Sequence, residues 1–290
     1  MKKVRCDRYQ IGSFVFEINH TGEILFPKSF LRFQGKDALP VQQSYELVLT
    51  DTIPQMSGEV IARRDDIEVL SDGGRERRVF RFLGAPMAYG CYEEVDEKHC
   101  RCMLQRGFLQ YSQVDTVFCS LFALERHLLA QNGCVLHCAA LYVGGEVILF
   151  SGPSGIGKST HASLWTEHVS GSWVINGDRA LLQKQDGRWH VFGWPVSGSS
   201  DICINEAYPL RAVVFLRQEP ENSGEQCKGA SAVKALVSQM TVNHWNLQAV
   251  THIWELAEAL AEDVPVYRYG CNTKPDAVYK LQKLLEGEDA

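Results

Sequence analysis

The 290-residue sequence has no apolar run long enough to span a membrane, and no apolar segment of signal-peptide length follows its basic first residues. We therefore expect a cytoplasmic protein with no membrane partner. The Lys and Arg residues form no dense stripe, and the formal net charge is −6. Nucleic-acid binding requires a positively charged surface, so we expect no nucleic-acid partner.

The sequence also lacks the paired cysteines of a structural zinc site. Its ten cysteines are scattered, and the densest group is Cys100 and Cys102 with His99 beside them and Cys91 nearby. Structural zinc usually takes two Cys-x2–4-Cys pairs, which this group does not supply. We interpret these cysteines as thiols on strands, reduced because the chain shows no export signal, with metal binding as the weaker alternative.

Length and apolar patterning predict two domains. A chain of 290 residues is long for one simple core. We predict a β-rich N-terminal domain over residues 1–112, with a packing or recognition role, and a second domain over residues 113–290. Alternating apolar residues favour strands in the first domain, and Asp72-Gly73-Gly74 favours a hairpin between the last two. These predicted strands are residues 13–18, 45–49, 67–70 and 78–82.

The second domain is predicted to have an α/β (α+β) fold with a mixed sheet. Helical spacing over residues 114–131 ends at Asn132-Gly133, which favours a left-handed cap. Strands over residues 134–143 and 147–150 meet at a Gly144-Gly145 turn, so a hairpin replaces a plain βαβ unit. Further strands are expected at 172–175, 180–183, 189–192, 212–216 and 266–269, and helices at 161–168, 231–239, 254–261 and 275–285.

Residues 151–160 contain the complete motif of a phosphate-binding loop: Gly152, four residues, then Gly157-Lys158-Ser159. In such a loop the backbone N–H groups and the N-terminus of the following helix face phosphate oxygens. Lys158 is expected to reach the β- and γ-phosphates of ATP, and the Ser159 hydroxyl is expected to hold Mg²⁺. A glycine-rich turn that binds nothing is the alternative. The predicted nucleotide-binding residues are Gly152, Pro153, Ser154, Gly155, Ile156, Gly157, Lys158, Ser159 and Thr160.

Asp178 is the predicted catalytic carboxylate. It follows the strand over residues 172–175, which we expect to neighbour the strand that feeds the loop. Open α/β sheets bind ligands at the carboxyl ends of such strands. Asp178 would either accept the proton of an acceptor hydroxyl or hold Mg²⁺, and the sequence leaves both roles open. A turn residue that caps backbone N–H groups is the structural alternative.

His137 precedes Gly152 by fifteen residues, on the strand antiparallel to the one that enters the loop. This register returns His137 toward the phosphates, although a lone His on an apolar strand is more often a core residue. The loop over residues 193–200 fits a functional loop and a surface turn equally well. The remaining polar candidates are residue types that are usually solvated: Arg179, Arg211, Arg217 and Asn205.

Four segments resemble the nucleotide domain of the HPr kinase and phosphoenolpyruvate carboxykinase family, over about residues 130–283. These segments are residues 135–140, 151–160, 174–178 and 194–198. The resemblance implies a P-loop kinase domain in which His137 lies in the active site and Asp178 acts as base. HPr kinases carry two adjacent Asp residues where this chain has Gly177-Asp178, which leaves one of the two carboxylate functions without a residue.

The resemblance implies an ATP- and Mg²⁺-dependent kinase with Lys158, His137 and Asp178 as catalytic residues. Its acceptor would be a hydroxyl, either a Ser of a peptide or protein or a small hydroxylated metabolite such as serine. Two other functions stay open: a nucleotide-gated binding module without phosphoryl transfer, and a carboxykinase-like enzyme. Assembly into a homo-oligomer also stays open.

Overall fold

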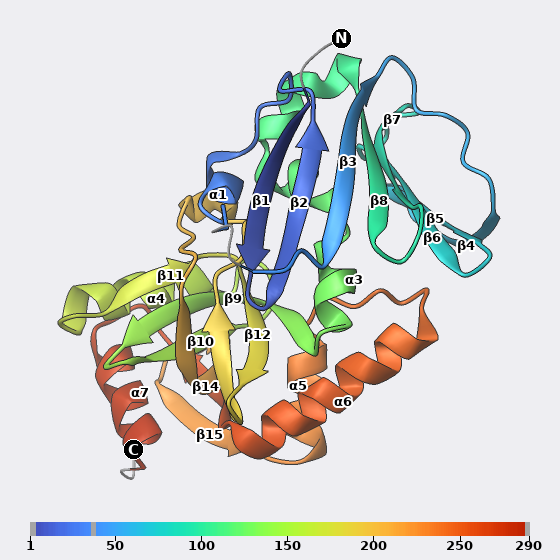
Figure 1. Ribbon diagram of the computed structural model, residues 1–290. Coiled ribbons are helices and arrows are strands. Elements are labelled where there is room, and N and C mark those ends of the chain that lie inside the picture. Colours follow the sequence, from blue (N-terminus) through green and yellow to red (C-terminus); the bar gives the residue numbers. More distant parts are fainter. Residues whose placement is uncertain (1–3, 36–38, 288–290) are drawn as a thin grey trace. The chain divides into compact units, whose positions relative to one another are not determined.

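The computed structural model describes residues 4–35 and 39–287. It divides into two compact units, Met1–His127 and Leu128–Ala290, and each contains one mixed eight-stranded sheet (Figure 1). The protein therefore has a mixed α+β fold. Among the helices in the described ranges, none has both the length and the apolar character needed to cross a bilayer.

The first unit is built on a sheet with the strand order β1-β2-β3-β8-β7-β6-β5-β4. Strand β3 runs parallel to both β2 and β8, and the other pairs are antiparallel. The strands are β1 (Arg5–Ile11), β2 (Phe14–His20), β3 (Gln43–Thr50), β4 (Glu59–Arg63), β5 (Ile67–Asp72), β6 (Arg75–Arg81), β7 (Ala88–Glu94) and β8 (His99–Gln105). The first helices are α1 (Lys28–Leu31) and the 3-10 helix η1 (Arg106–Gln113).

Two predictions for this unit are confirmed. Strands β5 and β6 form the expected hairpin, with Gly73 and Gly74 at φ values of +59° and +84°. Such values favour glycine, and they match the twist of a two-residue hairpin turn. The cysteines of the densest group lie on strands as free buried thiols: Cys91 on β7, and Cys100 and Cys102 on β8.

The predicted single helix over residues 114–131 is wrong. The structure has two short helices, α2 (Asp115–Ser120) and α3 (Leu124–Leu129), separated by Ala123 at a φ of +48°. Residues 121–124 are all buried, whereas a straight surface helix buries only one face. The interruption allows four consecutive residues to enter the core.

The boundary between the units lies after His127, later than the expected boundary at residue 112. The reason is that α2 and the start of α3 pack within the first unit. The ring centroids of Phe118 and Phe30 lie 4.9 Å apart, and the buried Arg78 of β6 donates a 2.6 Å hydrogen bond to Glu125.

The second unit is built on a sheet with the strand order β10-β9-β12-β13-β14-β16-β15, with β11 paired to β9 and β10 also paired to β14. Strands β10, β14 and β16 are parallel, so their carboxyl ends meet at one edge. The strands are β9 (Gly133–Val143), β10 (Glu146–Ser151), β11 (Trp173–Asn176), β12 (Arg179–Gln185), β13 (Arg188–Phe192), β14 (Ala207–Gln218), β15 (Ser223–Cys227) and β16 (Val266–Cys271).

Two hydrophobic cores cover opposite faces of this sheet. Alternate residues of β10 point to opposite faces, and Leu149 belongs to one core whereas Phe150 belongs to the other. Helices α5 (Ala230–Val237) and α6 (Leu247–Asp263) pack on the Leu149 side. Helices α4 (Lys158–His168) and α7 (Asp276–Glu286) pack on the Phe150 side (Figure 1).

Candidate functional site

The glycine loop, residues 152–157, connects the carboxyl end of β10 to the first residue of α4. Its three glycines have positive φ values: +135° for Gly152, +79° for Gly155 and +106° for Gly157. Residues with a Cβ rarely adopt such values. A Cβ on Gly152 would also lie 3.3 Å from the Ile156 side chain. The backbone of the loop therefore depends on glycine at these positions.

Lys158 is folded over the loop rather than exposed. Its side chain is 8% exposed, and its ammonium donates hydrogen bonds to the carbonyl oxygens of Gly152 at 3.0 Å and Pro153 at 3.1 Å. Burial lowers the pKa of Lys158, and the charge of Asp178 partly opposes this shift. A cation is thus held at the N-terminus of α4, where the helix dipole also favours an anion.

Asp178 lies between His137 and Arg179. Its Oδ1 is 3.8 Å from His137 Nε2, and its Oδ2 accepts a 3.2 Å hydrogen bond from Arg179 Nε. The sheet produces this cluster, because Arg179 of β12 is paired with His137 of β9. Burial lowers the pKa of His137, and the Lys158 charge lowers it further, so the ring is neutral at pH 7.

The expected position of the Asp178 strand is wrong in one respect. Strand β11 pairs with β9, and β9 lies between β11 and β10. The Gly144-Gly145 hairpin causes this, because it places β9 directly beside β10. Asp178 nevertheless lies beside β9, since its carbonyl oxygen accepts a 3.0 Å hydrogen bond from the backbone N–H of Cys138.

Asn176, which is not among the predicted site residues, positions Asp178. The side chain is fully buried, and its Oδ1 accepts hydrogen bonds from the backbone N–H groups of Asp178 at 3.0 Å and Arg179 at 3.1 Å. Its Nδ2 donates a 2.7 Å hydrogen bond to the carbonyl oxygen of Trp194. An Asn at the end of a strand and before a glycine is a typical turn signal, and this signal could have identified it.

The loop over residues 193–200 packs closely on Asp178. A Cβ on Gly198, which has a φ of +59°, would lie 2.9 Å from the Asp178 Cβ. A Cβ on Gly177 would lie 2.0 Å from the Ser200 hydroxyl oxygen. Trp194 and Val196 are buried. The loop is therefore part of the site's wall rather than a surface turn.

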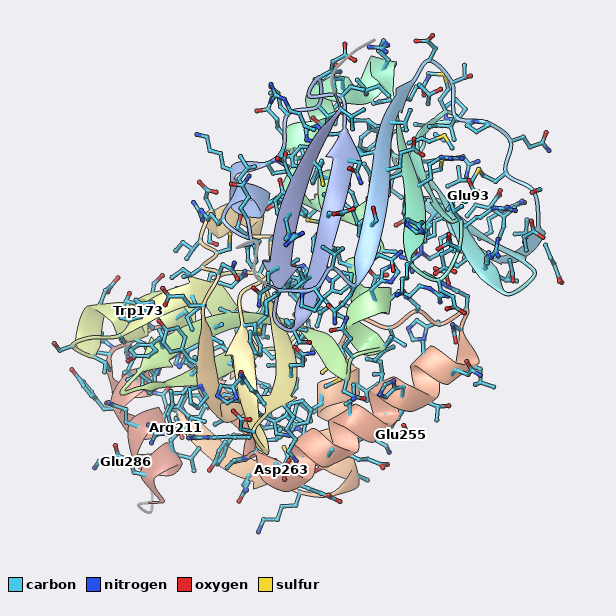
Figure 2. All side chains as sticks on the ribbon, in the orientation of Figure 1. Glu93, Trp173, Arg211, Glu255, Asp263 and Glu286 are labelled. Atoms are coloured by element: carbon cyan, nitrogen blue, oxygen red, sulfur yellow. The ribbon has the colours of Figure 1, made fainter. Side chains whose placement is uncertain are left out.

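The other sequence candidates are not brought to Asp178. Arg211, which is labelled in Figure 2, donates a 3.4 Å hydrogen bond to the carbonyl oxygen of Leu285 on α7. Asn205 is exposed. Arg217 lies at the carboxyl end of β14, where its Nε is 3.7 Å from Glu219.

The α4 pocket, a space of about 540 Å³, lies on one side of the glycine loop. Ile156 and Leu164 supply apolar lining, and Gln218 and Asn272 supply amide groups. Gln218 also donates 3.3 Å hydrogen bonds to the carbonyl oxygens of Gly155 and Ile156. Thr160, Thr273 and the carboxyl group of Glu219 also line it, so the pocket combines apolar and hydrogen-bonding groups, as small-molecule sites do.

His161 lines the α4 pocket as a neutral residue. It is 2% exposed, and its Nε2 accepts a 3.3 Å hydrogen bond from Trp165 Nε1. Burial lowers the pKa of His161 to about 4. The residue therefore contributes no positive charge to the pocket at neutral pH.

The α5 pocket, a space of about 330 Å³, lies on the other side of the glycine loop. It extends from Gly152 and Pro153 to Gln239, which follows α5. The backbone N–H of His137 donates a 3.0 Å hydrogen bond to the Gln239 carbonyl oxygen, so this pocket adjoins the Asp178 cluster.

Ser159 and Asp178 were the predicted metal ligands. The Ser159 hydroxyl is on an exposed residue, and Asp178 presents a carboxylate. Both are hard oxygen donors, which Mg²⁺ prefers, and Mg²⁺ usually completes its shell with water and substrate phosphates. The donor set thus fits Mg²⁺. Within the described ranges, no group of three or more His, Cys, Asp and Glu residues forms a metal cage.

Comparison with known proteins gives one family and a distant structural similarity. The family model described as SynChlorMet cassette protein ScmC matches residues 102–285. A solved structure of the Hpr(Ser) kinase/phosphatase from Coxiella burnetii is similar with a TM-score of 0.32 and 12% sequence identity, over 53% of this chain and 93% of that chain. None of the curated proteins searched matches the sequence.

Proposed function

This chain belongs to the ScmC family of SynChlorMet cassette proteins, and we propose that it is an ATP-dependent kinase that phosphorylates a hydroxyl group. The acceptor is a Ser of a peptide or protein, or a small hydroxylated metabolite. The observation that carries the proposal is the arrangement at the edge of the second unit's sheet. A glycine loop and a buried lysine lie at the start of α4, beside a carboxylate that accepts a hydrogen bond from Arg179 and lies 3.8 Å from His137.

The glycine loop supplies the phosphate contacts. Backbone N–H groups of the loop and of the first turn of α4 would face the phosphates, and Lys158 would exchange its two carbonyl partners for phosphate oxygens. The nucleoside would occupy the α4 pocket, which begins at Gly155 and Gly157 and so continues from the loop.

The Ser159 hydroxyl would hold Mg²⁺, with water and phosphate oxygens completing its shell, and the ion would neutralise charge on the β- and γ-phosphates of such substrates. The ion adds an electrostatic contribution to those of Lys158 and the α4 N-terminus. Together they stabilise the negative charge that is spread over the transferring group.

Asp178 acts as the base in this proposal. The acceptor oxygen forms a bond to the γ-phosphorus while the bond from that phosphorus to the β,γ-bridging oxygen breaks. The hydroxyl proton passes to the Asp178 carboxylate, and the products are ADP and a phosphate ester. Asn176 fixes the backbone of Asp178, and neutral His137 lies 3.8 Å from its Oδ1.

The test is transfer of label from γ-labelled ATP to a peptide, protein or metabolite in a cell extract. Asp178→Asn should lower the transfer rate by about 10²-fold or more and change the ATP affinity by less than about twofold. Asp186→Asn, in the exposed β12–β13 turn, is the matched control and should leave both values unchanged. Loss of affinity alone in Asp178→Asn would assign Asp178 to the metal and contradict its role as base.

A further inference from the structure

The α5 pocket has a charge opposite to that of the whole protein. The chain carries a formal net charge of −6, yet Arg217, Lys234 and Arg268 all line this pocket. Among its lining residues that the structure describes, none is an Asp or Glu. Three cations around about 330 Å³ repel one another, and an anion would relieve that repulsion.

The cations converge from three separate elements. Lys234 lies on α5, Arg217 is the penultimate residue of β14, and Arg268 lies on the neighbouring strand β16. The parallel pairing of β14 with β16 sets Arg268 opposite Phe215, which also lines the pocket. The sheet and the helix therefore hold the charges around one space.

Two of these cations have no partner among the residues that the structure describes. Within residues 4–35 and 39–287, the side chains of Arg268 and Lys234 make no hydrogen bond or ion pair. Arg217 Nε lies 3.7 Å from Glu219 Oε1, and both of these side chains are at least one-third exposed. Arg268 is only partly exposed, and its guanidinium group carries five N–H donors.

The α5 pocket also lies beside the residues to which the proposed kinase activity is assigned. Gly152 and Pro153, whose carbonyl oxygens hold Lys158, form one wall. Gln239, which accepts the His137 backbone hydrogen bond, forms another. A group in this pocket would lie on the opposite side of the glycine loop from the α4 pocket.

We propose that the α5 pocket binds an anionic group of the phosphate acceptor, so that the kinase selects a hydroxyl compound that also carries a carboxylate. This inference rests on the proposed function. Arg268, Lys234 and Arg217 are specificity residues: they hold the acidic group while the hydroxyl faces the γ-phosphate. The carboxylate could belong to a free hydroxy acid or to an acidic side chain beside a Ser in a peptide. Separate probe pairs distinguish these two sources.

The experiment is isothermal titration of the full chain at low ionic strength, saturated with Mg²⁺ and a non-hydrolysable ATP analogue. The first probe pair is L-serine and L-serinamide, which differ in the carboxylate. The second pair is acetyl-Glu-Ser-Glu-amide and acetyl-Gln-Ser-Gln-amide. In at least one pair the acid should bind about tenfold or more tightly than the corresponding amide, since each hydrogen bond to a charged group is strong. The pair that shows this preference identifies the source.

Variants of the lining residues test whether the preference for the acidic probe arises in the α5 pocket. Arg268→Gln and Lys234→Gln should each weaken binding of the acidic probe about tenfold, and Arg268→Lys should restore part of it. Lys228→Gln, at an exposed lysine outside the pocket, is the matched control and should change binding less than twofold. Lys234 is also exposed, so its variant tests the pocket without disturbing the core.

Equal binding of the acid and the corresponding amide in both pairs, or no binding of either acid, would overturn the inference. Retained preference in both Arg268→Gln and Lys234→Gln would overturn it as well. Failure of the proposed function gives a different result: the ATP analogue itself would not bind. The acid titration is then repeated without nucleotide, and it still tests the pocket.

Discussion

Asn176→Ala removes the side chain that fixes the turn carrying Asp178. The Asn176 amide makes three hydrogen bonds, at 3.0 Å and 3.1 Å to the backbone N–H groups of Asp178 and Arg179 and at 2.7 Å to the Trp194 carbonyl oxygen. The side chain is fully buried, so water does not replace these partners freely. Alanine would leave two donors and one acceptor unpaired.

The expected loss of stability is about 3–5 kcal/mol. An unpaired buried polar group costs about 1–3 kcal/mol, and three such groups with partial relaxation give this range. Because the turn also sets the position of Asp178, the phosphoryl-transfer rate should fall about tenfold or more, whereas ATP affinity should change little.

Urea unfolding followed by tryptophan fluorescence measures this loss in the second unit. All six tryptophans of the chain follow residue 128, so the signal reports that unit alone. Asn205→Ala is the matched control, since Asn205 is exposed, and it should lower stability by less than about 0.5 kcal/mol. A loss below about 1 kcal/mol in Asn176→Ala, or an unchanged transfer rate, would refute the positioning role of Asn176.

The remaining predictions concern His161 and Gly198. The folded-state pKa of His161 is about 4, below its ordinary value of 6.5, so the stability that the neutral ring contributes is complete above pH 6.5 and is lost as the pH falls toward 4. Between pH 6.5 and pH 4, the free energy of unfolding of the wild-type protein should fall by roughly 3 kcal/mol more than that of His161→Gln. Equal decreases in the two proteins, measured by urea unfolding, would contradict the burial argument. Gly198→Ala should lower the transfer rate about tenfold, because its Cβ would displace Asp178, whereas Gly187→Ala, with a φ of +80° and open space, should not. Similar rates in the two variants would show that the contact with Asp178 has no effect.

Local signals allowed much of the fold to be predicted. The turns at Gly73-Gly74 and Gly144-Gly145 require positive φ values, which few residues other than glycine adopt, and both hairpins are confirmed. Strand β15 was not predicted, because its residues are mostly exposed and polar at the end of the sheet. Only its pairing with β16 makes it a strand.

One part of the candidate site could be predicted from a local motif, whereas the other part depends on tertiary packing. The glycine loop and Lys158 are contiguous in sequence, so one motif identifies them. The cluster of His137, Asp178 and Arg179 depends on the pairing of β9 with β12, which no local pattern specifies. The α5 pocket depends on packing between a helix and two parallel strands, and so its arginines resembled ordinary surface residues in the sequence.

Titration of the purified protein with ATP in the presence of Mg²⁺ tests whether the glycine loop binds a nucleotide. We expect saturable binding with a dissociation constant between about 1 μM and 1 mM, the range usual for enzyme substrates. Lys158→Ala should weaken this binding about tenfold or more, because it removes a charged contact to the phosphates. Absence of binding at millimolar ATP, or equal affinity in Lys158→Ala, would contradict the assignment of the glycine loop to a nucleotide.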